Sequence, residues 1–324
     1  MGTSTNENTK RSWGRKASLC LFRKWHCSEA TMQICQDMIS RKEDTLLKAI
    51  AGLAGGIVSS GSTCGVVSGG ALGLALMHDE ALQKNGIEAE VGLISLVSDY
   101  AKWFNDNYGT TLCRERSGVD FWSLGGLVRY LLPGDRVLRC LSHISKSMQY
   151  LYENRNQDLP RIEVEEVDKQ AASTHCAQAV LKSVRANTTI GDPLLERLSV
   201  VLDGGVGLQG GACGALAGAI MDINIATGMN LRDATFMEAV KAFFVGHKNL
   251  RANKPKEIPE PYNVGKEVVR RFKEEAGAIE CRTITGMDFS DWTSFQTYIC
   301  SSDKCQKLIE LSIDEATKAI ERHI

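Results

Sequence analysis

The sequence predicts an all-α protein made of two tandem, homologous helical bundles related by pseudo-twofold symmetry. Three observations predict this fold: the chain repeats its own sequence words at a fixed spacing, its apolar residues recur at helical spacing, and runs typical of β-strands are nearly absent. The 324 residues suffice for two halves of about 150 residues, which is an ordinary domain size.

The repeat is clearest in two short sequence motifs that each occur once per half. The first is HCSEA at residues 26–30, which returns as HCAQA at 175–179. The second is CGVVSG at 64–69, which returns as CGALAG at 213–218. The offset between the copies is the same for both words, so the two words keep their spacing in each copy. An internal duplication therefore sets the architecture.

The second copy carries an insertion. Cys113-Arg114 returns as Cys281-Arg282, which is farther along the chain than the offset of the first two words predicts. The additional residues must lie between Gly218 and Phe272. We expect them to form a surface loop over residues 247–262, because this stretch is rich in proline and lysine.

Apolar spacing predicts five helices in each half, in the same order. In the first half they are expected over residues 30–39, 46–53, 65–78, 91–104 and 137–152. In the second half they are expected over residues 177–184, 194–202, 214–225, 264–275 and 304–322. Asp192-Pro193 supplies a helix start signal before residue 194. The one short β-branched run, Val200-Val201-Leu202, has a counterpart that is not strand-like, so no sheet is predicted.

Two segments are expected outside the bundles. Residues 1–24 are polar and basic and are predicted to form a flexible tail. Residues 159–170 are acidic, contain Pro160, and are predicted to link a first repeat at 25–158 to a second at 171–324.

Composition argues against several classes of partner. The net charge of −1 argues against nucleic acid, whose phosphates require a basic surface. No apolar run of 18 or more residues is present to span a bilayer, and the N-terminus lacks the apolar core of a signal peptide. We expect a cytoplasmic protein, in which cysteines serve as thiols, metal ligands or catalytic groups more often than as structural disulfides. The sequence leaves open a homo-oligomer and an unidentified redox partner protein.

Cysteines are the candidate functional residues. Eight of the eleven are matched across the duplication, four in each half. They are Cys27, Cys64, Cys113 and Cys140, matched by Cys176, Cys213, Cys281 and Cys305. Four cysteines kept in two diverged copies favour a functional site in each half over inert buried thiols. The unmatched Cys20, Cys35 and Cys300 are interpreted as structural, although Cys300 competes with Cys305 for the fourth position of the second copy.

Cys64 and Cys213 each follow a glycine-rich loop and precede a long apolar helix. At a helix N-terminus, backbone N–H groups and the helix dipole favour thiolate over thiol. We therefore predict that these two thiols have a pKa lowered towards neutrality and are the most reactive in the chain. The alternative is a buried, inert cysteine on a glycine-rich helix.

Histidine and arginine flank the matched cysteines. His26 and His175 precede the first cysteine of each copy, where a histidine either caps the helix or serves a mixed His/Cys metal site. Arg114 and Arg282 follow the third cysteine and could stabilise a thiolate or a negatively charged cluster. The alternative for these arginines is an ordinary salt bridge at a helix end.

One motif is interpreted as a false match. Residues 205–210 spell GxGxxG, the word of dinucleotide-binding loops, but that word requires a preceding strand and an acidic residue about 20 positions later. Asp222 comes too early, and the duplicate at 56–61 lacks the middle glycine. Nucleotide binding is therefore not predicted.

The cysteine pattern is similar to that of a known family. Four spaced cysteines, the second inside CGAxxG at 213–218 and the third opening CRxxxG, resemble the bacterial and archaeal redox family named for its C…GCAxxG…C…C pattern. The resemblance covers both copies, from about residue 26 to 322, and the first copy departs from the motif at Val66, where the family has alanine. The resemblance implies redox activity through the cysteines, and the split-Soret cytochromes look like haem-bearing relatives with an iron–sulfur site. This chain has no CxxCH word, so covalent haem is not expected.

The leading hypothesis is a redox protein that binds an iron–sulfur cluster through four cysteines per repeat and acts in electron transfer. A second hypothesis is a thiol–disulfide redox protein with Cys64 or Cys213 as nucleophile. A third is a protein that binds zinc or another metal. The dispersed spacing of the cysteines does not distinguish these three, because the usual CxxC pairs are absent.

Overall fold

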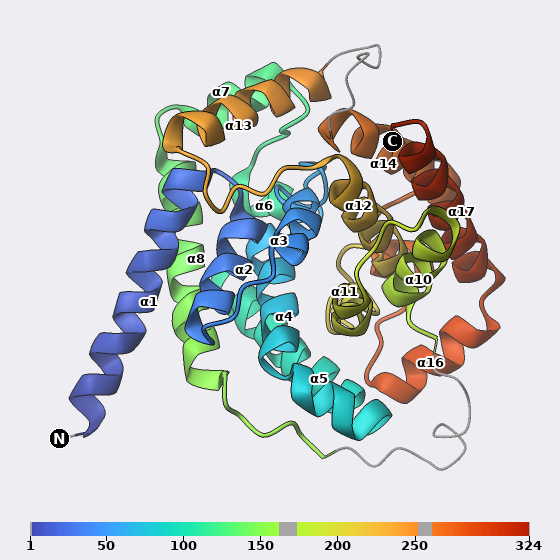
Figure 1. The fold of residues 1–324 in the computed structure, drawn as a ribbon, viewed down its shortest axis with the longest axis horizontal. Helices are drawn as coiled ribbons and strands as arrows, with labels where there is room; N and C mark the ends of the chain where they lie inside the picture. The colour runs from blue at the N-terminus through green and yellow to red at the C-terminus, as the bar shows by residue number, and fades with distance from the viewer. Residues whose placement is uncertain (1, 162–173, 252–260, 324) are drawn as a thin grey trace.

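The computed structural model of the protein describes residues 2–161, 174–251 and 261–323, with the side chains of residues 2–5 left out (Figure 1). Within these ranges the chain is built of α-helices and short 3₁₀ turns, and it contains no β-strand. The predicted all-α fold is thus confirmed. No helix in the described part of the chain is both long and apolar enough to cross a bilayer.

The first half contains all five predicted helices. Its elements are α2 (Cys27–Met38), α3 (Asp44–Ile50), the 3₁₀ turn η1 (Ala51–Leu53), α4 (Gly65–Met77), α5 (Asp79–Tyr108), α6 (Cys113–Ser117), α7 (Leu124–Leu131) and α8 (Asp135–Asn154). The sequence does not predict helices α6 and α7, because five and eight residues are too few for a clear helical period.

The second half repeats this order. Its elements are α10 (Cys176–Thr188), α11 (Pro193–Leu198), η2 (Ser199–Leu202), α12 (Gly214–Thr227), α13 (Phe236–Leu250), α14 (Pro261–Ala276), α15 (Cys281–Thr285), α16 (Trp292–Ser301) and α17 (Asp303–Glu321). Among these, α13 is the helix that the first half lacks in its described residues. Two isolated β-bridges, Thr63 with Leu112 and Ala212 with Glu280, occupy equivalent positions in the two copies. The duplication is therefore visible in the backbone as well as in the sequence.

The N-terminal segment is not the flexible tail that its polar composition predicted. Residues Gly2–Lys24 form helix α1, which packs along α8 (Figure 1). Its small residues permit a close approach, since a Cβ on Gly14 would lie 2.8 Å from the carbonyl oxygen of Ser145. Ala17 and Leu21 are buried on the same face. The apolar face of α1 is narrow, and the basic residues on its other faces hide the helical pattern in the sequence.

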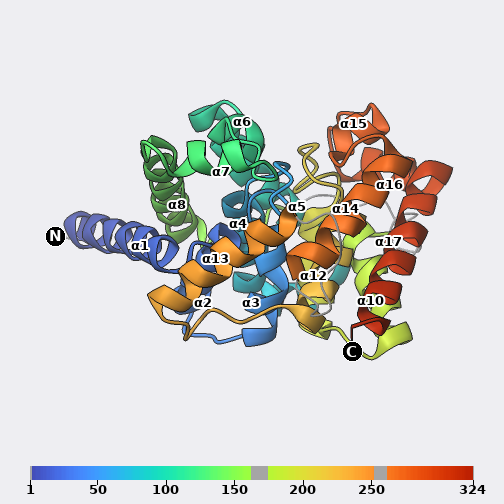
Figure 2. The ribbon, with the colours of Figure 1, turned by 90° about the horizontal axis from the view of Figure 1, so that it is seen from above.

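The insertion of the second half contains a helix, α13, which ends at Leu250 and so covers only the start of the surface loop predicted over residues 247–262. Helix α13 begins at a capping box formed by Thr235 and Glu238 and lies over the first half, beside α1 (Figures 1 and 2). The ring centroids of Phe243 and Trp25 are 5.0 Å apart, and His247, Asn249 and Leu250 at the end of the helix are buried, whereas Lys248 is exposed. Most of the predicted loop, residues 252–260, lies outside the described residues, and its last two residues begin α14. Residues 162–173, most of the predicted linker, lie outside them too.

The two halves share one continuous hydrophobic core. Each glycine-rich loop packs on a helix of the opposite copy. A Cβ on Gly207 would lie 2.7 Å from the backbone nitrogen of Ser98 in α5, and a Cβ on Gly265 in α14 would lie 2.8 Å from the side chain of Val58. The reciprocal contacts support the predicted pseudo-twofold arrangement. They also make the two copies one packed unit instead of two separate bundles.

Asp222 is a buried carboxyl group in α12 at a position where the first copy has Gly73. Both of its carboxyl oxygens are buried without a hydrogen-bond partner. Burial, with a smaller contribution from Glu196, raises the pKa of Asp222 to about 9. The folded state therefore binds the Asp222 proton more tightly than the unfolded state, and this group costs stability increasingly as the pH rises above about 4.

We expect Asp222→Asn to raise the free energy of unfolding at pH 7 by about 1–3 kcal/mol, because it removes the cost of the buried, unpaired acid. The gain should disappear at about pH 3, where aspartate is protonated in both states. Urea unfolding at the two pH values measures it. Equal unfolding midpoints for variant and native protein at pH 7 would contradict the prediction.

Candidate functional site

The four matched cysteines of the second half line one small cavity. Cys176 is the first residue of α10, Cys213 is the N-cap of α12, Cys281 is the first residue of α15, and Cys305 lies in the first turn of α17. The cavity measures about 20 Å³, and its other walls are mainly apolar. Four helix starts that are distant in sequence therefore converge on one point of the core.

The first half brings its four cysteines together in the same way. Cys27 begins α2, Cys64 is the N-cap of α4, Cys113 begins α6, and Cys140 lies in the second turn of α8. Each is close enough to the others for their charges to interact. A Cβ on Gly65 would lie 2.5 Å from the sulfur of Cys27, so the glycine after Cys64 is what lets α2 and α4 meet here.

Backbone N–H groups point at the sulfur atoms. Those of Val66 and Val67 face Cys64, and those of Ala215 and Leu216 face Cys213. The predicted position of both cysteines at a helix N-terminus is thus confirmed.

The predicted lowering of their pKa is wrong. Burial raises the pKa of Cys213 to about 11 and that of Cys64 further still, and it outweighs the backbone hydrogen bonds. At neutral pH both groups are thiols when nothing positively charged is bound to them.

Burial reverses the expected order of thiol reactivity. We expect Cys300, which is exposed on α16, to react with iodoacetamide at pH 7 well before Cys64 and Cys213, because the reagent attacks an accessible thiolate. Peptide mass spectrometry of the reduced, metal-free protein at timed intervals measures the rates. Alkylation of Cys64 or Cys213 as fast as Cys300 would contradict the prediction. It would mean that the helix N-terminus lowers the thiol pKa by more than burial raises it.

All eleven cysteines are free thiols in the structure. Over residues 2–161, 174–251 and 261–323, no three histidine, cysteine, aspartate or glutamate side chains surround a single point as metal ligands do. The four cysteines of the second copy line one cavity and those of the first copy lie close together, but neither set has coordinating geometry. In kind and number they match an iron–sulfur or zinc site, and a bound centre would require the side chains to turn towards it and the cavity to widen.

The two histidines have other partners. The Nδ1 of His26 lies 3.1 Å from the carbonyl oxygen of Lys24, and its Nε2 lies 3.2 Å from the hydroxyl of Tyr262. The Nδ1 of His175 lies 2.6 Å from Asp203, and its Nε2 lies 3.2 Å from Glu90. With both ring nitrogens of each histidine engaged, we leave His26 and His175 out of the ligand set proposed below.

Asp203 is a residue of the site that sequence reasoning missed. It is fully buried, pairs with His175, and accepts a hydrogen bond of 3.0 Å from the backbone N–H of Cys176. Burial alone would lower the pKa of His175, but Asp203 and Glu90 raise it to about 9, so this histidine is cationic at neutral pH. The first copy has Ala54 at the position of Asp203, so it lacks this buried ion pair beside its cysteine cluster.

A pair of tyrosines was also missed. The hydroxyl group of Tyr130 is hydrogen-bonded to Cys140, and its counterpart in the duplication, Tyr298, lines the cavity of the second copy. Each ring packs edge-on against a matched phenylalanine, Phe121 or Phe289, with centroids 4.9 and 5.5 Å apart. The two tyrosines have the same offset as the third cysteines of the copies, so the repeat that revealed the cysteines would have revealed them too.

The glycine-rich word at residues 205–210 is not preceded by a strand. Residues Ser199–Leu202 form η2, and the loop then turns back through a series of residues with positive φ, including Gly205 at +82° and Gly207 at +60°. A dinucleotide site requires a strand before the loop and a helix that continues the βαβ unit. The structure gives the loop a different role, which is to pack against α5 of the first half.

Fold and site together define a class: a duplicated, all-α, four-cysteine protein with one buried cysteine cluster in each copy. The family model described as "Putative redox-active protein (C_GCAxxG_C_C)" matches residues 25–150 and 174–319. The chain belongs to this family, and the two matched segments are consistent with a tandem duplication. A search of the curated proteins and a search of the solved structures find no match.

Proposed function

We propose that each half of the protein holds an iron–sulfur cluster on its four matched cysteines and that the protein acts in electron transfer. The observation that carries this proposal is that four cysteines from four helices come together in each half: those of the second half line one cavity, and those of the first lie close enough for their charges to interact. The proposed ligands are Cys27, Cys64, Cys113 and Cys140 in one half, and Cys176, Cys213, Cys281 and Cys305 in the other.

The surroundings of the sulfur atoms support a bound centre. Thiolates are costly in an apolar cavity, as the raised pKa of each matched cysteine indicates, and the iron ions of a cluster would offset that cost. Backbone N–H groups at Cys64 and Cys213 would hydrogen-bond to the thiolates and adjust the reduction potential. A bound cluster supplies one-electron oxidation and reduction, while the protein holds it, shields it from water and sets its potential.

A second candidate is a dithiol–disulfide couple within each cluster. The observation that favours it is that the sulfur atoms are close but do not surround a metal position in the described residues. Formation of a disulfide requires Cα atoms within about 7 Å and releases two electrons and two protons to an oxidant. Binding of zinc by the same cysteines is the third candidate.

Anaerobic purification followed by a visible spectrum and analysis of iron, sulfide and zinc separates the three. Iron and acid-labile sulfide, with visible absorption that dithionite bleaches, would support the cluster. A colourless protein whose mass falls by about 2 Da for each pair of cysteines on oxidation would support the disulfide. Stoichiometric zinc without colour would support the third candidate. A colourless protein without metal, even after reconstitution with iron and sulfide, would overturn the main proposal.

A further inference from the structure

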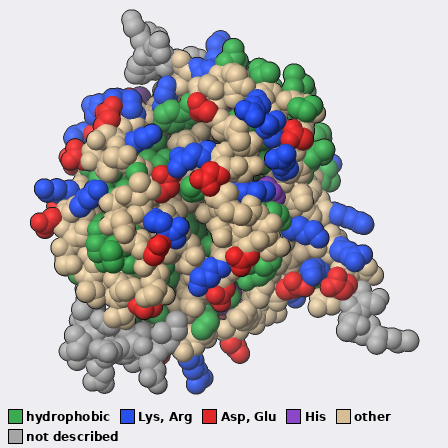
Figure 3. Space-filling view, turned by 180° about the vertical axis from the view of Figure 1, so that it is seen from behind, with side chains coloured by type: hydrophobic (Ala, Val, Ile, Leu, Met, Phe, Trp, Pro, Cys, Tyr) green, Lys and Arg blue, Asp and Glu red, His purple; other side chains and the backbone are tan. Residues whose placement is uncertain are grey.

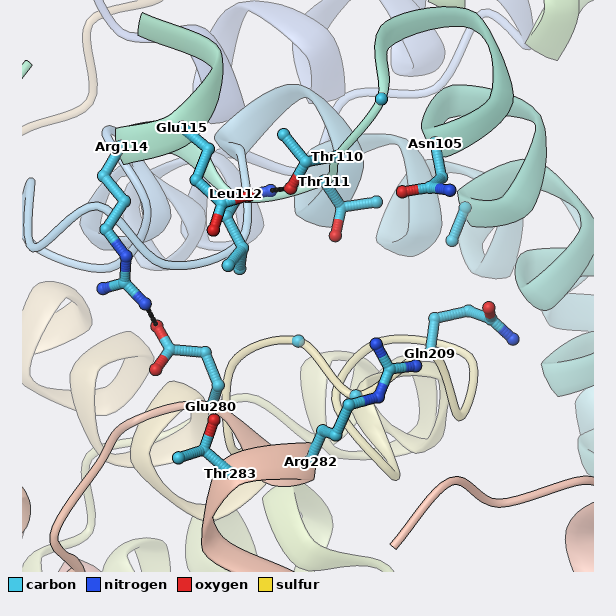
Figure 4. A pocket seen from close by; sticks show the side chains of 14 residues that line it. Asn105, Thr110, Thr111, Leu112, Arg114, Glu115, Gln209, Glu280, Arg282 and Thr283 are labelled. Carbon is cyan, nitrogen blue, oxygen red and sulfur yellow. Dashed lines mark hydrogen bonds and ion pairs between the residues drawn. The ribbon is translucent and has the colours of Figure 1, made fainter. Parts of the chain in front are cut away.

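A polar slot of about 440 Å³ lies between the two halves (Figure 4), and its lining includes Arg114 and Arg282, the residues that follow Cys113 and Cys281 in the sequence. One wall comes from the first half, from the end of α5 to α6, and the other comes from the glycine loop and α15 of the second half. Helices α6 and α15 stand on the same side of the molecule (Figure 2). The back of the molecule, seen in Figure 3, mixes basic and acidic side chains. No role for the slot follows from the family or from the proposed redox function.

The charges that line the slot are balanced. Two guanidinium groups, Arg114 and Arg282, face two carboxylates, Glu115 and Glu280, and the formal charge of the lining is therefore zero. The remaining polar side chains are the amides of Asn105 and Gln209 and the hydroxyls of Thr110, Thr111 and Thr283. A multiply charged anion would be repelled by the carboxylate of Glu115, whereas a molecule with one positive and one negative group could pair with both signs of charge.

The two arginines of the slot have ion pairs of different strength. Arg114 and Glu280 pair across the halves at 2.7 Å, and this pair closes one end of the slot (Figure 4). Glu280 is buried and its carboxylate is paired with Arg114, so it is not available to a ligand. Arg282 pairs with Asp288, and both side chains are more than half exposed, so this bridge contributes little.

The other two charged groups of the lining oppose each other. Figure 4 shows the guanidinium of Arg282 pointing into the slot from one wall and the carboxylate of Glu115 pointing into it from the other. The backbone of Gly210 packs closely against Arg282, because a Cβ on this glycine would lie 2.7 Å from the Cβ of Arg282. The amide of Gln209 is anchored by a 2.8 Å hydrogen bond to Ser98 of the opposite half. The glycine-rich loop therefore builds a wall of this slot.

We propose that the slot binds a small zwitterion of the amino-acid class. The ligand carboxylate lies against Arg282, its ammonium lies against Glu115, and the amides and hydroxyls of the walls orient the rest. The volume falls in the range of about 300–1,000 Å³ that is usual for small-molecule sites. This proposal stands independently of the metal content of the protein, so its test has a readout besides redox activity.

The test uses the twenty common L-amino acids, one at a time, with the full-length protein in saturation-transfer NMR and then titration calorimetry. We expect at least one amino acid to bind saturably, and its N-acetyl and amide derivatives to bind about tenfold more weakly or worse, since each lacks one charge. Arg282→Gln and Glu115→Gln should each weaken binding by a similar factor. Asp288→Asn is the matched control, because it removes the same exposed bridge without altering the lining, and it should bind like the native protein.

Three results would overturn the proposal. The first is that no amino acid binds the native protein. The second is that Arg282→Gln binds as tightly as Asp288→Asn, which would place the ligand elsewhere. The third is that the N-acetyl derivative, which keeps only the carboxylate, binds better than the free amino acid, which would make the slot an anion site. Circular dichroism of each variant excludes misfolding as the cause of lost binding.

Discussion

Replacement of Cys213 by serine is expected to remove about half of the iron and acid-labile sulfide from the reconstituted protein. The reason is that each half gathers its own four cysteines, so a cluster in the second half would lose one of four ligands while the first half keeps its set. Cys64→Ser should have the mirror effect, and the double variant should hold almost none. Iron and sulfide per chain, with electron paramagnetic resonance of the reduced protein, measure the result.

Two unmatched cysteines provide controls for this experiment. Cys35 is fully buried beside Gly73, and Cys300 is exposed, so serine at either position tests for general effects of losing a thiol. Both variants should keep the full iron content. Loss of nearly all iron from Cys213→Ser alone would indicate one site shared by the halves. Unchanged iron in Cys64→Ser and Cys213→Ser would leave these two cysteines as packing residues.

The second large effect is expected at Asp203. This carboxylate lies 2.6 Å from His175 and also accepts the backbone N–H of Cys176. Asp203→Ala would take the closer of two carboxylates away from a buried imidazolium and would leave a buried N–H without its acceptor. We expect a loss of about 3–5 kcal/mol in the free energy of unfolding at pH 7, because breaking a buried pair leaves an uncompensated charge.

Urea unfolding at pH 7 measures this loss, and Asp288→Asn serves as the control. Asp288 also pairs with a cationic side chain, Arg282, but that pair is exposed, so its removal should cost less than about 1 kcal/mol. Equal effects of the two substitutions would contradict a stabilising role for the buried pair. A loss at Asp203 that is accompanied by loss of iron only from the second half would further tie this residue to that cluster.

Local sequence was sufficient for the five predicted helices of each half and for the members of each cysteine cluster, but not for α1, α6, α7 and α13. Helical periodicity marked α8 and α17, because each has an apolar face several turns long, whereas α4 and α12 were marked by long apolar runs that are buried on almost every side. The duplication then identified which cysteines belong together, because two diverged copies retain the same positions. That Cys64 and Cys213 cap helices followed from the glycines before them and the apolar run after them.

Tertiary structure decided the properties that depend on which surfaces meet. The pKa of Cys213 is raised because other helices cover the thiol, and this burial cannot be predicted from the residues around Cys213. Helix α1 replaces the predicted tail, and α13 is a helix that the sequence did not predict, because their partners lie far away in the sequence, on α8 and across the first half. The sequence by itself therefore determined the duplication, the helical class and the cysteine sets. Burial, the Asp203–His175 pair and the slot between the halves were decided only by packing, since they arise from contacts between segments that are distant in the sequence.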